Sequence, residues 1–91
     1  MAQFEWDPEK DRQNRAKHHI SFEEAATIFD GPVLTAEDDG DYGEIRERTY
    51  GLLRGVVVVC VVHTLRDDRI RIISARKATP AERTLFNAHN G

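Results

Sequence analysis

The pattern of apolar and polar positions predicts a series of short helices and strands. Alternating or wholly apolar short runs are typical of strands, and polar capping residues followed by helix-forming residues mark helices. In chain order we predict a strand over 3–6, helices over 8–18 and 22–29, strands over 33–36, 45–54, 56–64 and 69–76, and a helix over 80–89. Because the last four strands follow one another directly, we expect an α+β fold, with a small antiparallel meander sheet packed by two N-terminal helices and one C-terminal helix.

Capping residues indicate where the predicted helices begin. Asp7 can accept a hydrogen bond from the free amides of the first helix. Ser21 and Thr79 each stand three residues before a glutamate, which is the capping-box pattern. The first helix has one apolar residue, Ala16, between positions 9 and 19. Because so little apolar surface cannot hold a helix by a broad buried stripe, we expect this helix to lie across the surface of the domain.

The central strand and the strand after it contain two informative residues. Cys60 lies within the apolar run of the 56–64 strand, so we expect a buried, unreactive thiol, and a single cysteine cannot form an internal disulfide. In the last strand, simple alternation places Ser74 and Arg76 on the same face as Ile72. A guanidinium that continues an apolar face must be paired or must line a cleft at the end of the sheet.

Length and charge limit the range of functions. A chain of 91 residues forms one domain, which we assign to 1–91. The 13 Lys and Arg residues against 16 Asp and Glu residues give a net charge of -3, which argues against a general nucleic-acid coat protein. The charge is unevenly spread, because residues 48–91 carry eight basic and three acidic residues, basic residues also cluster in the 8–18 helix, and the loop over 37–44 is acidic. This distribution predicts two local basic surfaces that can bind phosphate groups.

The sequence contains no pattern for secretion, membrane insertion or metal binding. Its first ten residues lack the apolar core of a signal peptide, and its longest apolar run, 56–62, is far shorter than the ~20 residues that span a bilayer. We therefore expect a soluble, cytoplasmic protein that does not contact a membrane. His18 and His19 diverge by about 100° on a helix, and no His-Glu-x-x-His or paired-cysteine motif is present, so we expect no metal and no other cofactor.

Metal-free cleavage of RNA fits the polar residues best. It needs a group that takes the 2′-OH proton, cations over the developing phosphorane charge and a donor for the leaving oxygen. Asn14, Lys17 and His18 share one face of the first helix, and a Glu-Arg pair precedes the central strand. The candidate catalytic residues are Arg76, Arg48, Glu47, Lys17 and His18. The candidate RNA-binding residues are Lys10, Asn14, Arg71, Lys77 and Arg83.

Each candidate also has a structural explanation. Arg76 can form an ion pair with Glu47 or Glu82. A cross-strand ion pair that uses Arg48 would carry little energetic weight. His63, at the end of the central strand, is either a base or a half-buried structural imidazole. The polar residues of the first helix can also be ordinary solvated residues.

Several short motifs follow one another in a specific order. They are Phe4-x-Trp6-Asp7-x-x-Lys10, Asn14-x-x-Lys17-His18-x-Ile20-Ser21-Phe22-x-Glu24-Ala25, Glu47-Arg48, Arg71-Ile72-Ile73-Ser74-Ala75-Arg76-x-Ala78 and Glu82-Arg83. Each is weak by itself, but the ordered set is specific and covers nearly the whole chain. It resembles the BrnT family of toxins from bacterial type II toxin–antitoxin modules. The sequence departs from that family at His19, where glycine is usual, and at Phe86, where tyrosine is common.

The resemblance implies a compact RelE-like fold and an endoribonuclease that cleaves RNA and arrests growth by inhibiting translation. In such a site Arg76 and Arg48 would steady the phosphate. Lys17 and His18 would contact the substrate or transfer protons, and Glu47 would be the candidate base. The resemblance also implies a BrnA-like antitoxin with a ribbon-helix-helix domain. The family pattern is two toxins with two antitoxins, and the toxin would bind DNA only through the antitoxin.

A second interpretation, of a different class, is a non-enzymatic protein-binding module with an antitoxin-binding or co-repressor role. Its basic surface would hold an acidic partner or a segment of the antitoxin. Substitution of Arg76 separates the two, because loss of toxicity with retained antitoxin binding favours catalysis. A transcriptional regulator acting by itself is disfavoured, because no helix-turn-helix spacing is present.

Overall fold

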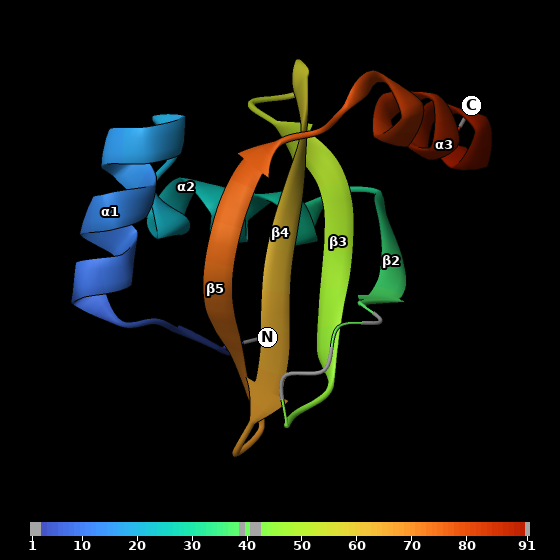
Figure 1. Cartoon of the computed structure of the whole chain (residues 1–91). Coiled ribbons are helices and arrows are strands. Elements are labelled where there is room, and N and C mark those ends of the chain that lie inside the picture. Colours follow the sequence, from blue (N-terminus) through green and yellow to red (C-terminus); the bar gives the residue numbers. More distant parts are fainter. Residues whose placement is uncertain (1–2, 39, 41–42, 91) are drawn as a thin grey trace.

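The protein folds as a mixed sheet with helices on both faces and along one edge (Figure 1). The computed structural model describes residues 3–38, 40 and 43–90. The strands are β1 (Gln3–Glu5), β2 (Val33–Asp38), β3 (Arg46–Leu53), β4 (Val57–Arg66) and β5 (Arg69–Lys77). The helices are α1 (Pro8–His18), α2 (Phe22–Ala26), the 3₁₀ helix η1 (Thr27–Asp30) and α3 (Pro80–Asn90). The predicted α+β fold is confirmed, although β2 extends into the predicted acidic loop, part of which lies outside the described residues.

The sheet has the strand order β1-β5-β4-β3-β2. The strands from β2 to β5 form the predicted antiparallel meander. The first strand differs, because β1 pairs with β5 in parallel and places Glu5 opposite Arg71. These two side chains form an ion pair of 2.8 Å. The alternation of polar and apolar residues in β1 does not determine which edge of the sheet the strand joins. This parallel pair was therefore not predicted from the sequence.

The predicted helix starts are confirmed by their capping bonds. Asp7 accepts from the N–H of Glu9 at 2.9 Å, and Pro8 occupies the first turn of α1. Ser21 and the glutamate at the third position of α2 form a complete capping box. Thr79 makes the same reciprocal bonds before α3, at 2.8 and 3.2 Å. The second predicted helix is shorter than expected, because its last residues wind as the 3₁₀ helix η1.

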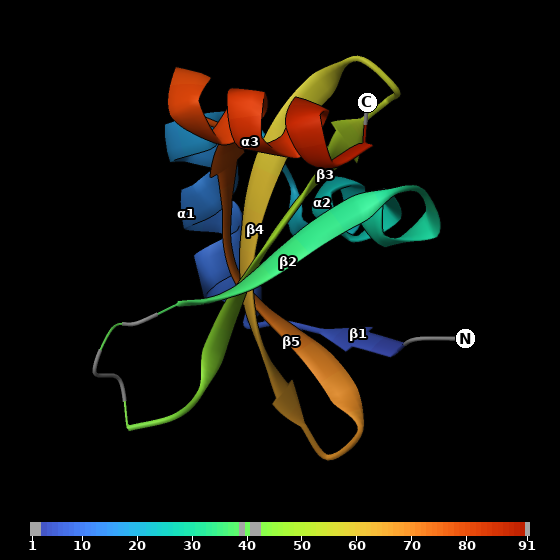
Figure 2. The ribbon, with the colours of Figure 1, turned by 90° about the vertical axis from the view of Figure 1, so that its right-hand side faces the viewer.

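Two hydrophobic cores lie on opposite faces of the sheet. Figure 2 shows the ribbon from the side of β2, with α3 across the top and α2 at the right behind the strands. On the face toward α2 and η1, called the α2 face here, the buried residues include Phe22, Ile28, Val59 and Ile72. On the other face, called the α3 face, a smaller core contains Tyr50, Val58, Cys60 and Phe86. The Cys60 thiol is fully buried, and this burial raises its pKa, in agreement with an unreactive core cysteine. In Figure 1, α3 lies across the end of the sheet where β5 ends, so the other half of the α3 face carries no helix.

A β-bulge in β5 reverses the alternation that the sequence suggested. The register shifts between Val62 and His63, which leaves Ile73 as an extra residue without a partner on β4. Beyond this point Arg76 lies opposite Cys60, on the α3 face. The prediction that Arg76 shares a face with the isoleucine before the bulge is therefore wrong. One inserted residue moves every later side chain of the strand to the opposite face.

Candidate nucleic-acid interface

Arginine side chains line the part of the α3 face that no helix covers. Alternation along β3 places Arg46 and Arg48 on the same face as the buried Tyr50. Arg48 pairs with Val62 on β4, and Val62 pairs with Ser74 on β5, so these three side chains lie next to one another on this face. The basic face, as we use the term, consists of Arg46, Arg48, Ser74 and Arg76 on the sheet with Lys10, Lys17 and His18 on α1.

The guanidinium of Arg48 is the most informative group of this face. Its residue is half-buried, and its Nε is fully buried without a hydrogen-bond partner among the described residues. Leaving a buried donor unpaired costs about 1–3 kcal/mol, and more when the group is charged. A guanidinium N–H binds phosphate oxygens in charge-assisted hydrogen bonds. Since the Nε is closed to solvent, a phosphate on this face would satisfy it only as the half-buried side chain turns outward to meet the phosphate.

Arg76 is held in a network at the end of the sheet. Its Nη1 and Nη2 donate to the two carboxylate oxygens of Glu82 at 2.7 and 3.1 Å, and the Tyr50 hydroxyl donates to the same carboxylate at 2.9 Å. The bonds from Arg76 lower the pKa of Glu82 to about 2, while burial raises the pKa of Tyr50 to about 12. Of the two structural partners expected for Arg76, the structure selects Glu82.

Tyr50 and Glu82 are parts of this network that the sequence analysis did not include among the site residues. Glu82 had a signal, because it occupies the last position of a capping box. It was also one of the two ion-pair partners expected for Arg76, but it was not counted as part of the site. Tyr50 carried no such signal, because it reads as one more apolar position of a strand.

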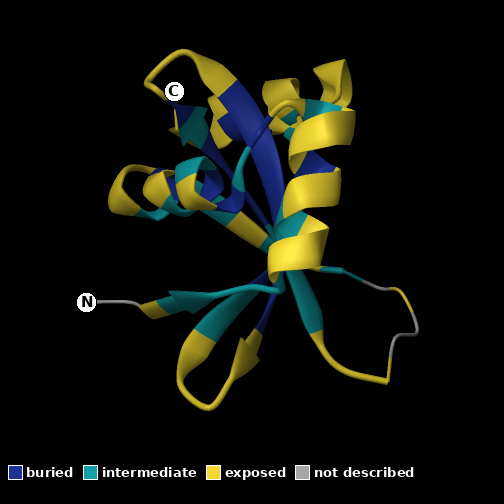
Figure 3. Cartoon of the chain, turned by 90° about the vertical axis from the view of Figure 1, so that its left-hand side faces the viewer, coloured by how far each residue is buried: buried dark blue, intermediate teal, exposed yellow. Residues whose placement is uncertain are grey.

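The polar helix α1 forms the flank of the basic face. Lys10, Lys17 and His18 line a groove of about 260 Å³ together with Gln13 and Ser74. Ser74 also lies in the cross-strand row of the Arg48 guanidinium, so the groove opens onto the basic face. Figure 3 shows α1 exposed along most of its length, as expected for a helix with almost no apolar stripe. Asn14 lines the groove as well, so the structure brings four of the predicted residues together here.

Asn14, which was predicted to contact RNA, is held by hydrogen bonds inside the protein. The residue is 7% exposed, and its Nδ2 donates to the carbonyls of Ile20 and Ala75, each at 2.9 Å. Its Oδ1 accepts from the N–H of Ala75 at 3.1 Å. The side chain therefore bonds to the edge of β5 beyond the short segment that β1 covers. Because both amide donors are used inside the protein, a direct contact of Asn14 with RNA is not supported.

Glu47 lies away from the two arginines that were predicted to act with it. Neighbouring residues of a strand point to opposite faces, so Glu47 shares the α2 face with Thr49 and lies opposite His63. The His63 ring is buried, and its Nε2 lies 2.7 Å from the Thr49 hydroxyl. Burial lowers the pKa of His63, while the nearby Glu47 carboxylate acts in the opposite direction. Of the two roles left open for His63, the structure favours the structural one.

The remaining predicted RNA-binding residues are dispersed. Arg71 is occupied by the ion pair with Glu5 at the β1 edge. Lys77 lines a second hollow together with residues of the β3–β4 hairpin, and this hollow adjoins the groove beside α1 because His18 lines both. Arg83 is exposed on α3. Of these three side chains, Arg71 and Arg83 line neither the groove nor the hollow next to it.

The comparison with known families identifies the chain. A family model described as the ribonuclease toxin BrnT of type II toxin–antitoxin systems matches residues 6–82. The chain belongs to the BrnT family. The matched range contains every residue of the basic face and ends at Glu82, the partner of Arg76. The resemblance seen in the sequence motifs is confirmed.

A solved structure shows the same fold. The crystal structure of the Brucella abortus ribonuclease toxin BrnT superimposes with a TM-score of 0.67 at 21% sequence identity. The match covers 87% of this chain and 99% of the Brucella chain. A comparison with curated proteins finds no match. The five-stranded sheet with its helices is therefore a BrnT-type fold.

The two departures from the BrnT pattern occupy defined places in the fold. His19 ends α1 with a φ of 61°, in the left-handed region that glycine adopts most easily. This geometry explains a preference for glycine at that position. Phe86 is 2% exposed and fills the core beneath α3. The chain thus keeps the ring that packs there without a phenol hydroxyl.

The described part of the chain has neither a metal-binding cluster nor a membrane-spanning helix. No group of three or more His, Cys, Asp or Glu side chains there is placed to hold a metal ion. No helix in the same part is long and apolar enough to cross a membrane.

Proposed function

We propose that this protein is a metal-independent endoribonuclease, the toxin of a type II module. The observation that carries the proposal is the unpaired, buried Nε of Arg48 within a basic face. Lys17 and His18 flank that face in the groove beside α1. RNA cleavage requires cations over the phosphate and a group that exchanges protons, and this face supplies both types of side chain. Membership of a family of ribonuclease toxins supports the same chemistry.

The geometry suggests a division of roles. Arg48 and Lys17 hold the scissile phosphate and stabilise the charge that develops on it. His18 exchanges the protons, because its imidazole is half-buried in the groove and Glu47 lies on the other face. Arg76 supplies a fixed positive charge at the end of the sheet, oriented by its carboxylate partner.

The biological setting follows from the family. A type II toxin has a protein antitoxin. We propose that the antitoxin is BrnA-like, with a ribbon-helix-helix domain, and that two toxins assemble with two antitoxins. In this arrangement the toxin cleaves RNA in the cytoplasm and inhibits translation, and it contacts DNA only through the antitoxin.

Cleavage of RNA by the purified protein in the presence of EDTA tests the proposal. Arg48→Ala should lower the cleavage rate roughly 100-fold, as loss of one preorganised charge does at other sites. Arg12→Ala is the matched control, because Arg12 pairs with Glu9 on the exposed side of α1 and should leave the rate unchanged. A folded wild-type protein that leaves RNA intact, or equal rates for both variants, would refute the proposal.

Arg76 is a poorer first choice for this test, and it bears on the alternative function. Removing its guanidinium also breaks both bonds to Glu82, so lost activity can reflect lost stability. Because Arg76 is already paired with Glu82, its guanidinium is less available to a phosphate. This pairing favours the alternative function, a non-enzymatic antitoxin-binding module. Antitoxin binding by a protein that does not cleave RNA would establish that alternative.

A further inference from the structure

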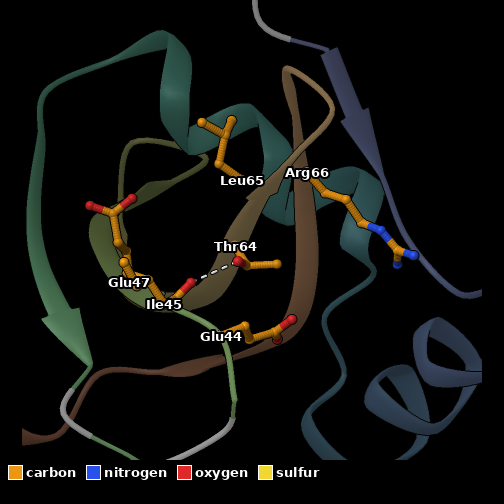
Figure 4. A pocket seen from close by; sticks show the side chains of 6 residues that line it. All are labelled: Glu44, Ile45, Glu47, Thr64, Leu65 and Arg66. Atoms are coloured by element: carbon orange, nitrogen blue, oxygen red, sulfur yellow. Dashed lines mark hydrogen bonds between the residues drawn. The ribbon is translucent and has the colours of Figure 1, made fainter.

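The far end of the sheet from α3 contains a second surface, distinct from the basic face. It is a hollow of about 770 Å³ where β3 begins and β4 ends (Figure 4). Its lining consists of Glu44, Ile45, Glu47, Thr64, Leu65 and Arg66. We call it the strand-end hollow. The proposed cleavage of RNA uses none of its residues.

Two large apolar side chains of this hollow are exposed to solvent. Ile45 is 71% exposed and Leu65 is 69% exposed. Their backbone is nevertheless fixed, because the Thr64 hydroxyl donates to the Ile45 carbonyl at 2.7 Å, as Figure 4 shows. Leu65 is also held in the β4–β5 ladder, opposite Ile70. Ile45 and Leu65 thus form an exposed apolar pair on a fixed backbone. Such a pair, lining one hollow, is typical of a contact surface for another protein.

Two carboxylates and one guanidinium line the strand-end hollow, and a third carboxylate lies beside it. Glu44 and Glu47 line it, and Glu37 lies directly opposite Glu47 on the neighbouring strand β2. Like charges in directly opposed positions of a sheet are unfavourable. Arg46 donates to Glu44, and Figure 4 shows Arg66 pointing away from Glu47. The carboxylates repel RNA and favour a positively charged occupant.

We infer that the strand-end hollow docks a segment of the antitoxin that carries lysine or arginine side chains beside apolar ones. The apolar side chains of that segment would cover Ile45 and Leu65, while its cations would approach Glu37 and Glu47. This inference rests on the proposed function only in that it takes the antitoxin of a type II toxin as the partner. The antitoxin is thereby anchored at a surface that RNA does not occupy.

Calorimetric titration of the toxin with its purified antitoxin tests this inference. The variants Ile45→Lys and Leu65→Lys each remove an apolar side chain that the antitoxin segment would cover. Each also adds a positive charge that would repel the lysine or arginine side chains of that segment. Each should weaken binding roughly tenfold or more. Val56→Lys is the matched control, because Val56 is 78% exposed at the opposite end of the sheet and should bind as the wild type does. All three positions are at the surface, so the thermal unfolding of the variants should match the wild type.

The salt dependence of binding tests the charge part of the inference. Affinity should fall as ionic strength rises, and Glu47→Gln should make that fall less steep. Unchanged binding by Ile45→Lys and Leu65→Lys, equal losses with Val56→Lys, or no antitoxin binding by the wild type would overturn the inference. RNA cleavage by the three lysine variants is a separate readout, expected to be unchanged. Failure of cleavage in the wild type would overturn the proposed ribonuclease and leave the docking result interpretable.

Discussion

Replacement of Asn14 by alanine should be among the most destabilising changes on the polar surface helix. The side chain donates to two carbonyls and accepts from one N–H, at 2.9, 2.9 and 3.1 Å. Alanine would leave the N–H and carbonyl of Ala75 and the carbonyl of Ile20 without these partners, in a site that is 7% exposed. A buried group without its partner costs about 1–3 kcal/mol, so three such groups near the lower limit give a loss of about 3–4 kcal/mol.

This loss is large relative to the whole fold. A domain of this size has a free energy of unfolding of about 5–14 kcal/mol. At about 4–8 °C for each kcal/mol, the melting temperature of Asn14→Ala should fall by roughly 12–32 °C. Asn14→Asp should be at least as destabilising at neutral pH, because it places a carboxylate against two carbonyl oxygens.

Urea denaturation followed by circular dichroism measures this effect. Gln13→Ala is the control, because Gln13 is an exposed neighbour on α1 whose side chain donates only to Glu9, at 3.4 Å. It should change the free energy of unfolding by less than about 0.5 kcal/mol. A loss below about 1 kcal/mol for Asn14→Ala would refute the structural role. RNA cleavage per folded molecule should be retained by Asn14→Ala at low temperature, whereas a direct RNA contact predicts its loss.

Three further predictions test other parts of the fold. His19→Gly should raise the free energy of unfolding by about 1 kcal/mol in urea denaturation, because the residue has a φ of 61°; a decrease would contradict this. Glu82→Gln should lower stability by about 1–3 kcal/mol at pH 7. The pKa of Glu82 is lowered from 4.5 to about 2, so its carboxylate contributes fully to the free energy of unfolding above pH 4.5 and loses that contribution as the pH falls through about 2. The free energies of unfolding of the wild type and of Glu82→Gln should therefore converge in acid. A difference that stays constant with pH would contradict the ion pair with Arg76. Gly51→Ala should cost about 1–3 kcal/mol in thermal unfolding, because its Cβ would lie 2.9 Å from the Cβ of the buried Ile28; an unchanged melting temperature would show that Ile28 can move.

The local structure of this chain could be predicted because short-range interactions determine it. Asp7, Ser21 and Thr79 cap the helices that follow them through bonds to residues two or three positions away. The β4–β5 hairpin turns at Asp67 and Asp68, whose φ angles of 52° and 65° suit the residue types found in tight turns. Neither feature requires knowledge of distant parts of the chain.

The composition of the site could be predicted only in part. The lysines and the histidine of α1 do line one groove, because residues three and four positions apart share a helix face. Glu47 and Arg48 are adjacent in the sequence, so both were predicted to act in one catalytic site. Neighbouring residues of a strand point to opposite faces, however, so the two side chains lie on different sides of the sheet. Adjacency in a strand is thus a poor guide to which side chains meet.

Tertiary structure decided the remaining features, because they depend on contacts between distant segments. The bulge at Ile73 is set by how β5 pairs with β4, and it alone moves Arg76 to the face of Glu82. Asn14 bonds to Ala75, 61 positions away, so no local pattern separates it from a solvated helix residue. Periodicity, caps and motif order therefore determined the elements and the family of this protein, while strand register and edge pairing decided which side chains form its surfaces. The physical reason is that caps and periodicities act over a few residues, whereas register is fixed only when segments far apart in the chain pack together.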